Sequence, residues 1–296
     1  RARVIALGAV LVGFTTLVSV ARLHGRQPLD ELRARADQGD AEAQYRLGVR
    51  YLAALGVPQD DAEAIRWHRL AADQGLRQAQ YSLAISYDRG RGVQQDLSEA
   101  IRWYRRAAEQ GHAAAQFDLG LKYMNGRGVR QDDAEAVRWY HLAADQGNAN
   151  AQGGLGLMYS NGQGVDQDNA EAVRWYRLAA TQGNATAQHN LGLMYLNGRG
   201  VPQDVAEADR LVGLAANPGN FAPAQFFLGM MSFDGRRVPQ DFAEAIRWHR
   251  LAADQGFASA QYALGVMYGN GQGLARNDVE AVRWYRRAAD QGLPSA

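Results

Sequence analysis

The sequence of 296 residues contains no cysteine. This absence excludes a disulfide framework, a metal site built from thiolates and a cysteine nucleophile. It leaves the redox compartment open, because a chain without cysteine is compatible with oxidising and with reducing surroundings. The absence therefore limits the chemistry of the protein without indicating where the protein works.

An excess of positive charge is also missing. The 32 lysine and arginine residues are balanced by 31 acidic residues, so the net charge is +1, and Lys122 is the only lysine. A general nucleic-acid-binding protein needs an excess of cationic side chains to neutralise phosphates. We therefore expect no nucleic-acid partner.

Motifs of catalysis and ligand binding are missing as well. None of the six histidines stands in a His-x-x-x-His pair with a nearby Glu. The loop Gly126-Arg-Gly128 and its copies lack a preceding strand and a following Lys-Ser/Thr step, so turn chemistry explains them better than phosphate binding. The acidic residues recur at helix starts and form no isolated pair for acid–base work. The sequence predicts a protein that is not an enzyme, with no catalytic residue, metal site, cofactor or small-molecule ligand.

The chain has one long apolar run, from Val4 to Val20, which follows Arg1 and Arg3 and precedes Arg22. A run of roughly 17 residues is long for a signal peptide and just long enough to span a membrane. We therefore predict that residues 1–21 are a signal peptide or an uncleaved membrane anchor, with a buried helix as the remaining alternative. Either of the first two predicts export, to the periplasm or to the inner membrane facing the periplasm, with membrane contact only through this segment.

What the chain does contain is a repeated unit. An Ala-Gln pair recurs about every 36 residues, which is typical of helical-hairpin repeats. Residues 22–39 form a linker and half a unit, and residues 40–296 form a solenoid of seven units. Their approximate bounds are 40–75, 76–111, 112–147, 148–183, 184–219, 220–256 and 257–292. The chain stops where the first helix of a further unit would begin, so we expect a sequence truncated at its C-terminus.

Each unit contains two helical patterns. The first reads Ala-x-Ala-Gln-x-x-Leu-Gly-x-x-Tyr, with Leu, Gly and Tyr on one face. Glycine inside a helix costs about 1 kcal/mol relative to alanine, so its recurrence indicates the close approach of a neighbouring helix. The second helix begins at an acidic residue with a glutamate three residues later, such as Asp132 and Glu135, which is a capping-box arrangement. It then carries a Trp, another aromatic residue and an Ala-Ala pair, and it ends at Gln-Gly.

No unit of this kind can bury its apolar face alone, so the units must stack. The pattern predicts an all-α protein, a solenoid of about seven helix–turn–helix repeats of about 36 residues each. The tryptophans recur at one position of the second helix, and we expect them to form one continuous buried seam. They are Trp67, Trp103, Trp139, Trp175, Trp248 and Trp284.

The complete unit reads A-x-A-Q-x-x-L-G-x-x-Y-x-x-G-x-G-V-x-Q-D-x-x-E-A-x-R-W-Y-R-x-A-A-x-Q-G. It resembles the Sel1-like repeat, a relative of the tetratricopeptide repeat, and the resemblance covers residues 30–296. The resemblance implies a right-handed α-solenoid whose first helices line a concave surface. It also implies an adaptor that assembles other proteins, often in the bacterial envelope. Some relatives act on β-lactams, but they are rich in cysteine, so this activity is not carried over.

Candidate partner-binding residues come from positions that vary while the repeat formula holds. Most lie two residues after the repeated glutamine, on the side of the first helix opposite Leu and Tyr. The fifth unit has Leu211-Val212 in place of Trp-Tyr, and the sixth unit has additional Phe and Met residues. Such side chains suit a binding anchor; the alternatives are solvated positions, or aromatics that fill the space of the missing Trp. The candidates are Arg46, Ser82, Asp118, Asn190, Phe226, Phe227 and Met231.

These features predict a non-enzymatic scaffold or adaptor of the bacterial cell envelope that binds an unidentified protein on its concave face. One alternative is an envelope protein that binds carbohydrate, either peptidoglycan or exopolysaccharide. Another is a solenoid that forms part of a larger enzyme. Exposed aromatic platforms in a groove would favour carbohydrate, whereas a mixed polar and apolar surface would favour a protein partner.

Overall fold

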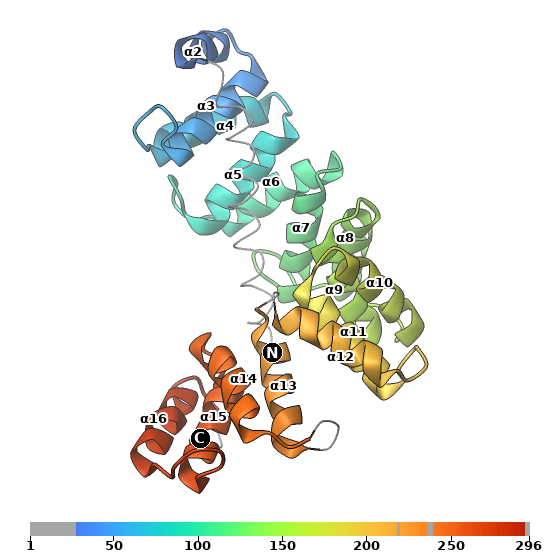
Figure 1. Ribbon diagram of the computed structural model, residues 1–296. Coiled ribbons are helices and arrows are strands. Elements are labelled where there is room, and N and C mark those ends of the chain that lie inside the picture. The colour runs from blue at the N-terminus through green and yellow to red at the C-terminus, as the bar shows by residue number, and fades with distance from the viewer. Residues whose placement is uncertain (1–27, 218–219, 236–238, 294–296) are drawn as a thin grey trace. The chain divides into compact units, whose positions relative to one another are not determined.

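The computed structural model describes residues 28–217, 220–235 and 239–293. Every helix or strand within these ranges is an α-helix, which confirms the all-α prediction (Figure 1). None of these helices combines the length and the apolar character that crossing a membrane requires. The predicted signal peptide or anchor at residues 1–21 lies outside the described residues, and so does the C-terminal end at residues 294–296.

Seven helical hairpins follow the half-unit helix α2 (Leu29–Asp37). The first helices of the hairpins are α3 (Ala41–Ala53), α5 (Arg77–Arg89), α7 (Ala113–Asn125), α9 (Ala149–Asn161), α11 (Ala185–Asn197), α13 (Ala222–Asp234) and α15 (Ala258–Asn270). The second helices are α4 (Asp61–Asp73), α6 (Leu97–Glu109), α8 (Asp133–Asp145), α10 (Asn169–Thr181), α12 (Val205–Ala216), α14 (Phe242–Asp254) and α16 (Asp278–Ala289).

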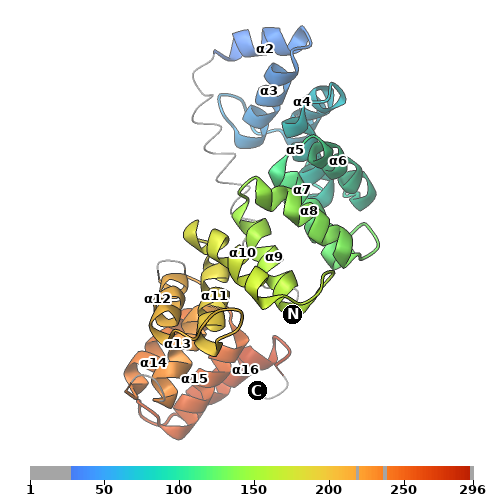
Figure 2. The same cartoon turned by 90° about the vertical axis from the view of Figure 1, so that its right-hand side faces the viewer.

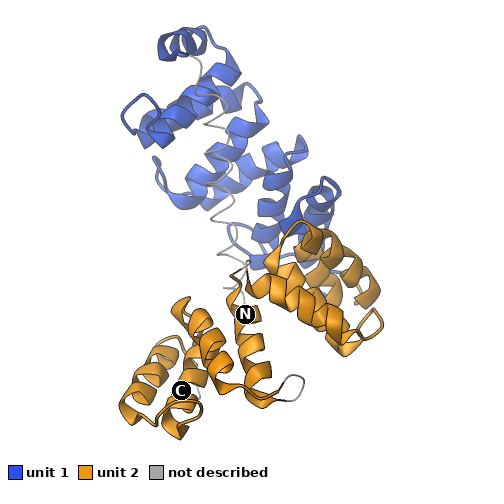
Figure 3. Cartoon of the chain, in the orientation of Figure 1, with its two compact units in different colours: residues 1–151, 163–165 blue, residues 152–162, 166–296 orange. Residues whose placement is uncertain are grey.

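Helices pack mainly against their neighbours in sequence, as a solenoid requires. Within a hairpin the first helix lies beside the second, as α5 and α6 or α15 and α16 do (Figures 1 and 2). The second helix then packs against the next first helix, as α6 does against α7 and α14 against α15. The chain divides into two compact units (Figure 3). The first ends at Ala151 and includes Gln163–Val165, and the second comprises Gln152–Gly162 and the chain from Asp166 onwards.

The acidic caps begin the second helices as expected. Asp132 accepts a hydrogen bond from the backbone N–H of Glu135 at 2.9 Å. The glutamate side chain turns the other way, however, and forms contacts within its own helix. Its Oε2 accepts from Nε of Arg138 at 2.9 Å, and its Oε1 accepts from the indole Nε1 of Trp139 at 2.9 Å. The glutamate therefore holds the tryptophan as well as the helix surface.

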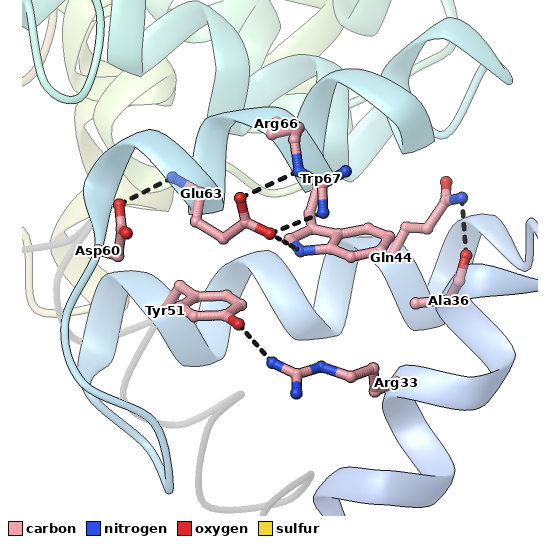
Figure 4. A network of polar contacts seen from close by, with 8 residues as sticks. All are labelled: Arg33, Ala36, Gln44, Tyr51, Asp60, Glu63, Arg66 and Trp67. Atoms are coloured by element: carbon pink, nitrogen blue, oxygen red, sulfur yellow. Dashed lines mark hydrogen bonds and ion pairs between the residues drawn. The ribbon is translucent and has the colours of Figure 1, made fainter.

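The repeated glutamine joins one repeat to the previous one. Gln44 is buried, and its Nε2 donates to the backbone oxygen of Ala36 at 3.1 Å (Figure 4). Its Oε1 accepts from Nε2 of Gln74, at the end of the second helix, at 2.8 Å. An amide suits this place because one side chain satisfies an acceptor and a donor at once. Figure 4 also shows the repeated pairing of Trp67 with Glu63.

The mid-helix glycines are explained by close approach, as predicted. A Cβ atom added at Gly120 would lie 2.7 Å from the ring of Tyr140 on α8. The tryptophan seam is confirmed only in part. Trp67, Trp103, Trp139 and Trp175 are buried, whereas Trp248 and Trp284 are half-buried. In the fifth repeat the smaller Leu211 occupies the tryptophan position, so the row of tryptophans is interrupted there.

Candidate partner-binding face

The first helices carry all seven candidate residues, and none of these residues is fully exposed. In the first unit, Arg46 lies on α3, where its Nε pairs with Oε1 of Glu42 at 2.9 Å. Ser82 lies on α5 and hydrogen-bonds to Tyr45 on α3; burial raises the pKa of Tyr45, and this bond opposes the rise. This side of the first helices is therefore semi-buried by contacts between successive repeats and is not a freely solvated surface.

Asp118 on α7 has the most unusual environment of the candidates. Its Oδ2 accepts a hydrogen bond from the hydroxyl of Tyr81 on α5 at 2.9 Å. Burial raises the pKa of Asp118 from 3.8 to about 6, while the hydrogen bond from Tyr81 and the charge of Lys122 act in the opposite direction. The carboxylate is thus short of compensating charge, and a cationic group that reached it would be stabilised there.

A buried ion pair lies on the same two helices and was missed in the sequence. Nζ of Lys122 donates to Oδ2 of Asp88 at 2.6 Å, and it lies 5.8 Å from the ring centroid of Tyr104. Nη2 of Arg127 lies 3.3 Å from Oδ1 of Asp88. Burial lowers the pKa of Lys122, and the carboxylate of Asp88 opposes that shift. The sequence does contain an indication of this buried charge. The only lysine stands where three later repeats have the buried residues Met158, Met194 and Met267.

In the second unit the equivalent surface is more aromatic. Nδ2 of Asn190 on α11 donates to the hydroxyl of Tyr176 at 3.4 Å. The ring of Phe227 on α13 meets the ring of His189 edge-on at 6.0 Å between centroids. The ring centroid of Phe226 lies 5.4 Å from that of His249. These rings fill space between helices, which supports the packing interpretation for both phenylalanines.

Met231 on α13 is half-buried, whereas the equivalent Met194 and Met267 are buried. Arg236 and Arg237, which distinguish the sixth repeat, lie outside the described residues.

Two histidines of the second helices, His68 and His249, are buried against aromatic rings of the first helices. His68 is completely buried, and its ring stacks on Tyr45 with 5.3 Å between centroids. Burial lowers the pKa of His68 to about 4, so the ring is neutral at pH 7. Across the described residues, no group of three or more His, Asp or Glu side chains is arranged to hold a metal ion.

The candidates form one local set in each of the two compact units. In the first unit Asp118 is joined by Tyr81 and lies near the buried pair of Asp88 and Lys122, which makes a polar cluster between α5 and α7. In the second unit Phe227 lies among aromatic side chains. Among the described residues, neither set contains a nucleophile with an adjacent base.

Comparison with known proteins places the repeat in a known class. The model of the Sel1 repeat matches residues 41–76, 77–112, 113–148, 149–184, 185–217, 222–257 and 258–293. A solved Sel1 repeat protein from Oxalobacter formigenes is 34% identical with a TM-score of 0.75, and the match covers 98% of this chain and 86% of that one. No curated protein matches the chain.

Two further solved structures are similar. A protective antigen of uropathogenic Escherichia coli strains, which displays an SLR fold, is 41% identical with a TM-score of 0.74. The match covers 89% of this chain and 56% of the antigen, so the chain spans little more than half of that protein's length. The immunity protein Pa5087 from Pseudomonas aeruginosa is 20% identical with a TM-score of 0.51, covers 72% of this chain and 81% of that one, and shares the fold alone.

Proposed function

The chain belongs to the Sel1 repeat family, and from this premise we propose that it is a non-enzymatic scaffold that binds a protein partner on the face of its first helices. Sel1 repeat proteins are generally scaffolds for protein interactions. The observation that carries the proposal is the surface around Asp118, where a carboxylate with a raised pKa is held by one tyrosine hydroxyl. Such a carboxylate is suited to pair with an arginine or lysine side chain of a partner.

The mixed character of the face supports a protein partner over a carbohydrate. Polar groups in the first unit and aromatic groups in the second offer both charge and apolar contact, as protein interfaces do. Stacking on a sugar would need exposed aromatic rings, whereas Phe226 and Phe227 are half-buried against other rings. The carbohydrate alternative therefore has less support.

Export to the bacterial envelope is part of the same proposal. Its support is the apolar run from Val4 to Val20 with basic residues before it. A fusion of residues 1–40 to a reporter enzyme that is active only outside the cytoplasm should give activity in a bacterial host. Deletion of residues 4–20 from the fusion should abolish that activity, and an inactive full fusion would overturn the proposal of export.

The binding face can be tested by site-specific crosslinking in intact cells. A photoreactive residue at position 82 of α5 follows Tyr81, whose hydroxyl donates to Asp118. One at position 142 of α8 provides the control, because Leu142 is exposed on a second helix. A discrete protein adduct from position 82, absent from position 142 and weakened by Asp118→Arg, would support the proposal. Co-sedimentation with cell-wall material without any protein adduct would overturn it in favour of carbohydrate binding.

A further inference from the structure

The repeats hold their tryptophans in a recurring socket. Trp139 is 4% exposed and packs among residues of the previous repeat and of its own first helix, including Ala107 and Leu119. Its Nε1 donates to Glu135 at 2.9 Å, and the guanidinium carbon of Arg138 lies 4.5 Å from the centroid of the indole ring. The socket thus combines an apolar wall, a carboxylate that accepts the indole N–H, and a cation over the ring face.

The same glutamate contact and cation recur around other tryptophans. Trp67 donates to Glu63 at 2.9 Å, with the guanidinium of Arg66 4.4 Å from its ring centroid. The guanidinium of Arg247 lies 4.0 Å from the ring centroid of Trp248. A guanidinium group lies over each of the six tryptophans, although at Trp103 and Trp284 it comes from the arginine three residues later. The glutamate contact is formed at Trp67, Trp139 and Trp248, whereas the buried Nε1 of Trp103 makes no hydrogen bond. The cation is therefore common to the repeats, and the carboxylate acceptor is used in some of them.

In the fifth repeat the socket lacks its tryptophan. Leu211 occupies the position, and a hollow of about 460 Å³ opens between α10, α11 and α12. Its lining includes Arg177, Leu191, Tyr195, Glu207, Leu211 and Leu214. All of these residues belong to the second compact unit.

The polar parts of the socket remain in place. Glu207 still pairs with Arg210, with 2.7 Å between Oε2 and Nε, as the equivalent glutamates do in other repeats. Leu211 has no N–H to donate and no ring to lie beneath the guanidinium group. The extra aromatics of the sixth repeat do not fill the hollow, because Phe227 packs with Val212 and His189 and is not among the lining residues.

We propose that this hollow binds a tryptophan side chain of a partner polypeptide. The indole N–H would donate to Glu207, and its ring face would meet the guanidinium group of Arg210, which lines the hollow. These interactions are electrostatically complementary to an indole, and a phenylalanine would supply only the apolar part. The inference rests on the proposed scaffold function, because the incoming side chain belongs to a protein partner.

A neighbouring hollow explains why the ligand is a polypeptide segment rather than a free small molecule. It also measures about 460 Å³, and it shares Arg177 and Thr181 with the first. Val173 and Leu178 give it an apolar lining, and Leu178 is 43% exposed. Two adjoining hollows can hold a tryptophan side chain and a nearby apolar side chain of the same peptide. A few such buried side chains usually supply most of the binding free energy of an interface.

The test uses N-acetyl-tryptophanamide as the probe and the full chain with isotope-labelled leucine methyl groups. Titration should shift the methyl resonances of Leu191, Leu211 and Leu214 with a dissociation constant on the order of 1 mM, as expected for a fragment of this size. N-acetyl-leucinamide should bind at least about tenfold more weakly, since it lacks the ring and the N–H. No shift of these methyls by the tryptophan probe, or equal shifts by both probes, would overturn the proposal.

Leu211→Trp provides the blocking variant, because it restores the residue that fills this socket in other repeats. It should melt at a higher temperature and lose binding of the probe. Unchanged affinity in Leu211→Trp would overturn the proposal.

Glu207→Gln should weaken binding severalfold, and it serves as the second variant if Leu211→Trp does not fold. Leu214→Ala should weaken binding, whereas Leu251→Ala, at the equivalent position beside Trp248, is the matched control.

The experiment is separate from the test of the scaffold function. If crosslinking from position 82 captures a protein while the tryptophan probe does not bind, the hollow is not a tryptophan site and the scaffold proposal stands. If the probe binds and Leu211→Trp abolishes both probe binding and capture of that protein, the hollow is part of the partner interface.

Discussion

At the scale of single residues, Asp88 and Lys122 place charge where most of the other repeats have apolar side chains. Asp118 and the pair of Asp88 and Lys122 lie on α5 and α7, within reach of tyrosine hydroxyls and rings. A buried charge costs free energy unless it is paired and hydrogen-bonded. These groups therefore control local stability, and they make the first unit sensitive to pH.

Asp118 should make the protein less stable as the pH rises through about 6. Burial raises its pKa from 3.8 to about 6, so the folded state holds the proton more tightly than the unfolded state does. The stabilisation is complete below pH 3.8 and is lost as the pH rises to about 6. Asp118→Asn, which stays neutral, should therefore stabilise the chain at pH 7.5 by about 1–2 kcal/mol after allowance for partial exposure.

Urea unfolding of the wild type and of Asp118→Asn at pH 4 and pH 7.5 measures this effect. The free energies of unfolding of the two proteins should differ least at pH 4. Tyr81→Phe is the companion variant, since loss of its hydrogen bond should raise the pKa of Asp118 further. Equal differences between wild type and Asp118→Asn at both pH values would contradict the assignment.

The pair of Lys122 and Asp88 should behave as a coupled unit. Lys122→Met introduces the residue that four later repeats have at this position, but it leaves the buried Asp88 with the partly exposed Arg127 as its ion-pair partner. Removal of one partner of a buried pair should cost about 3 kcal/mol. Asp88→Leu combined with Lys122→Met should recover most of that loss, because a buried ion pair can be replaced by apolar side chains at little cost. The measurement is a double-mutant cycle, in which the free energies of unfolding of Asp88→Leu, Lys122→Met and the double variant are compared with that of the wild type. If the losses of the single variants add up in the double variant, the two residues are not coupled.

At the scale of the helix, the structure distinguishes glycines that look alike in the sequence. Gly120 lies against the ring of Tyr140, where an added Cβ would be 2.7 Å away. Gly153, also inside a first helix, has no atom closer than 3.7 Å to an added Cβ. The first glycine is required by close packing between the two helices of a hairpin, and the second is not.

Substitution of these two glycines by alanine should have opposite effects. Gly120→Ala should destabilise the protein by about 1–3 kcal/mol, because the ring of Tyr140 must move in a packed core. Gly153→Ala should stabilise it by up to about 1 kcal/mol through helix propensity. Thermal unfolding of both variants is the measurement, and a stabilised Gly120→Ala would show that the two helices are not held at this distance.

At the scale of the whole molecule, stability is distributed along the array because each repeat packs mainly against its neighbours. Glutamine contacts such as Gln44 with Ala36 fix one repeat to the previous one. The same contact recurs between Gln116 and Ala108 and between Gln261 and Ala253. The glutamine contact is therefore common to successive repeats even where their other contacts differ.

Removal of one complete repeat should leave a folded, shorter solenoid. Deletion of residues 113–148 joins equivalent positions and restores the contact between a second helix and the next first helix. Circular dichroism should show the same helicity per residue and a cooperative melt at a lower temperature. Deletion of residues 113–130, which removes only one helix of the hairpin, is the control and should disrupt the array. Complete loss of helicity in the first deletion would contradict the solenoid.

The sequence by itself was sufficient for the helices, their caps and the family. A repeat of about 36 residues carries its information locally, because caps such as Asp132, terminating glycines and apolar periodicity act within one hairpin. Seven copies of one formula also identify Gln44 and its equivalents as structural positions. The candidate face could be located on the first helices, but its residues could not be ranked from the sequence.

Only the tertiary structure decided what neighbouring repeats do to one another. It brought Lys122 to Asp88 from the previous repeat, and it placed the candidate partner-binding residues in half-buried positions. It also left a hollow at Leu211 that Phe227 does not fill. These features depend on the volume and charge that two or three adjacent helices leave between them. A periodic sequence specifies each helix, whereas the space between helices is defined only when they pack.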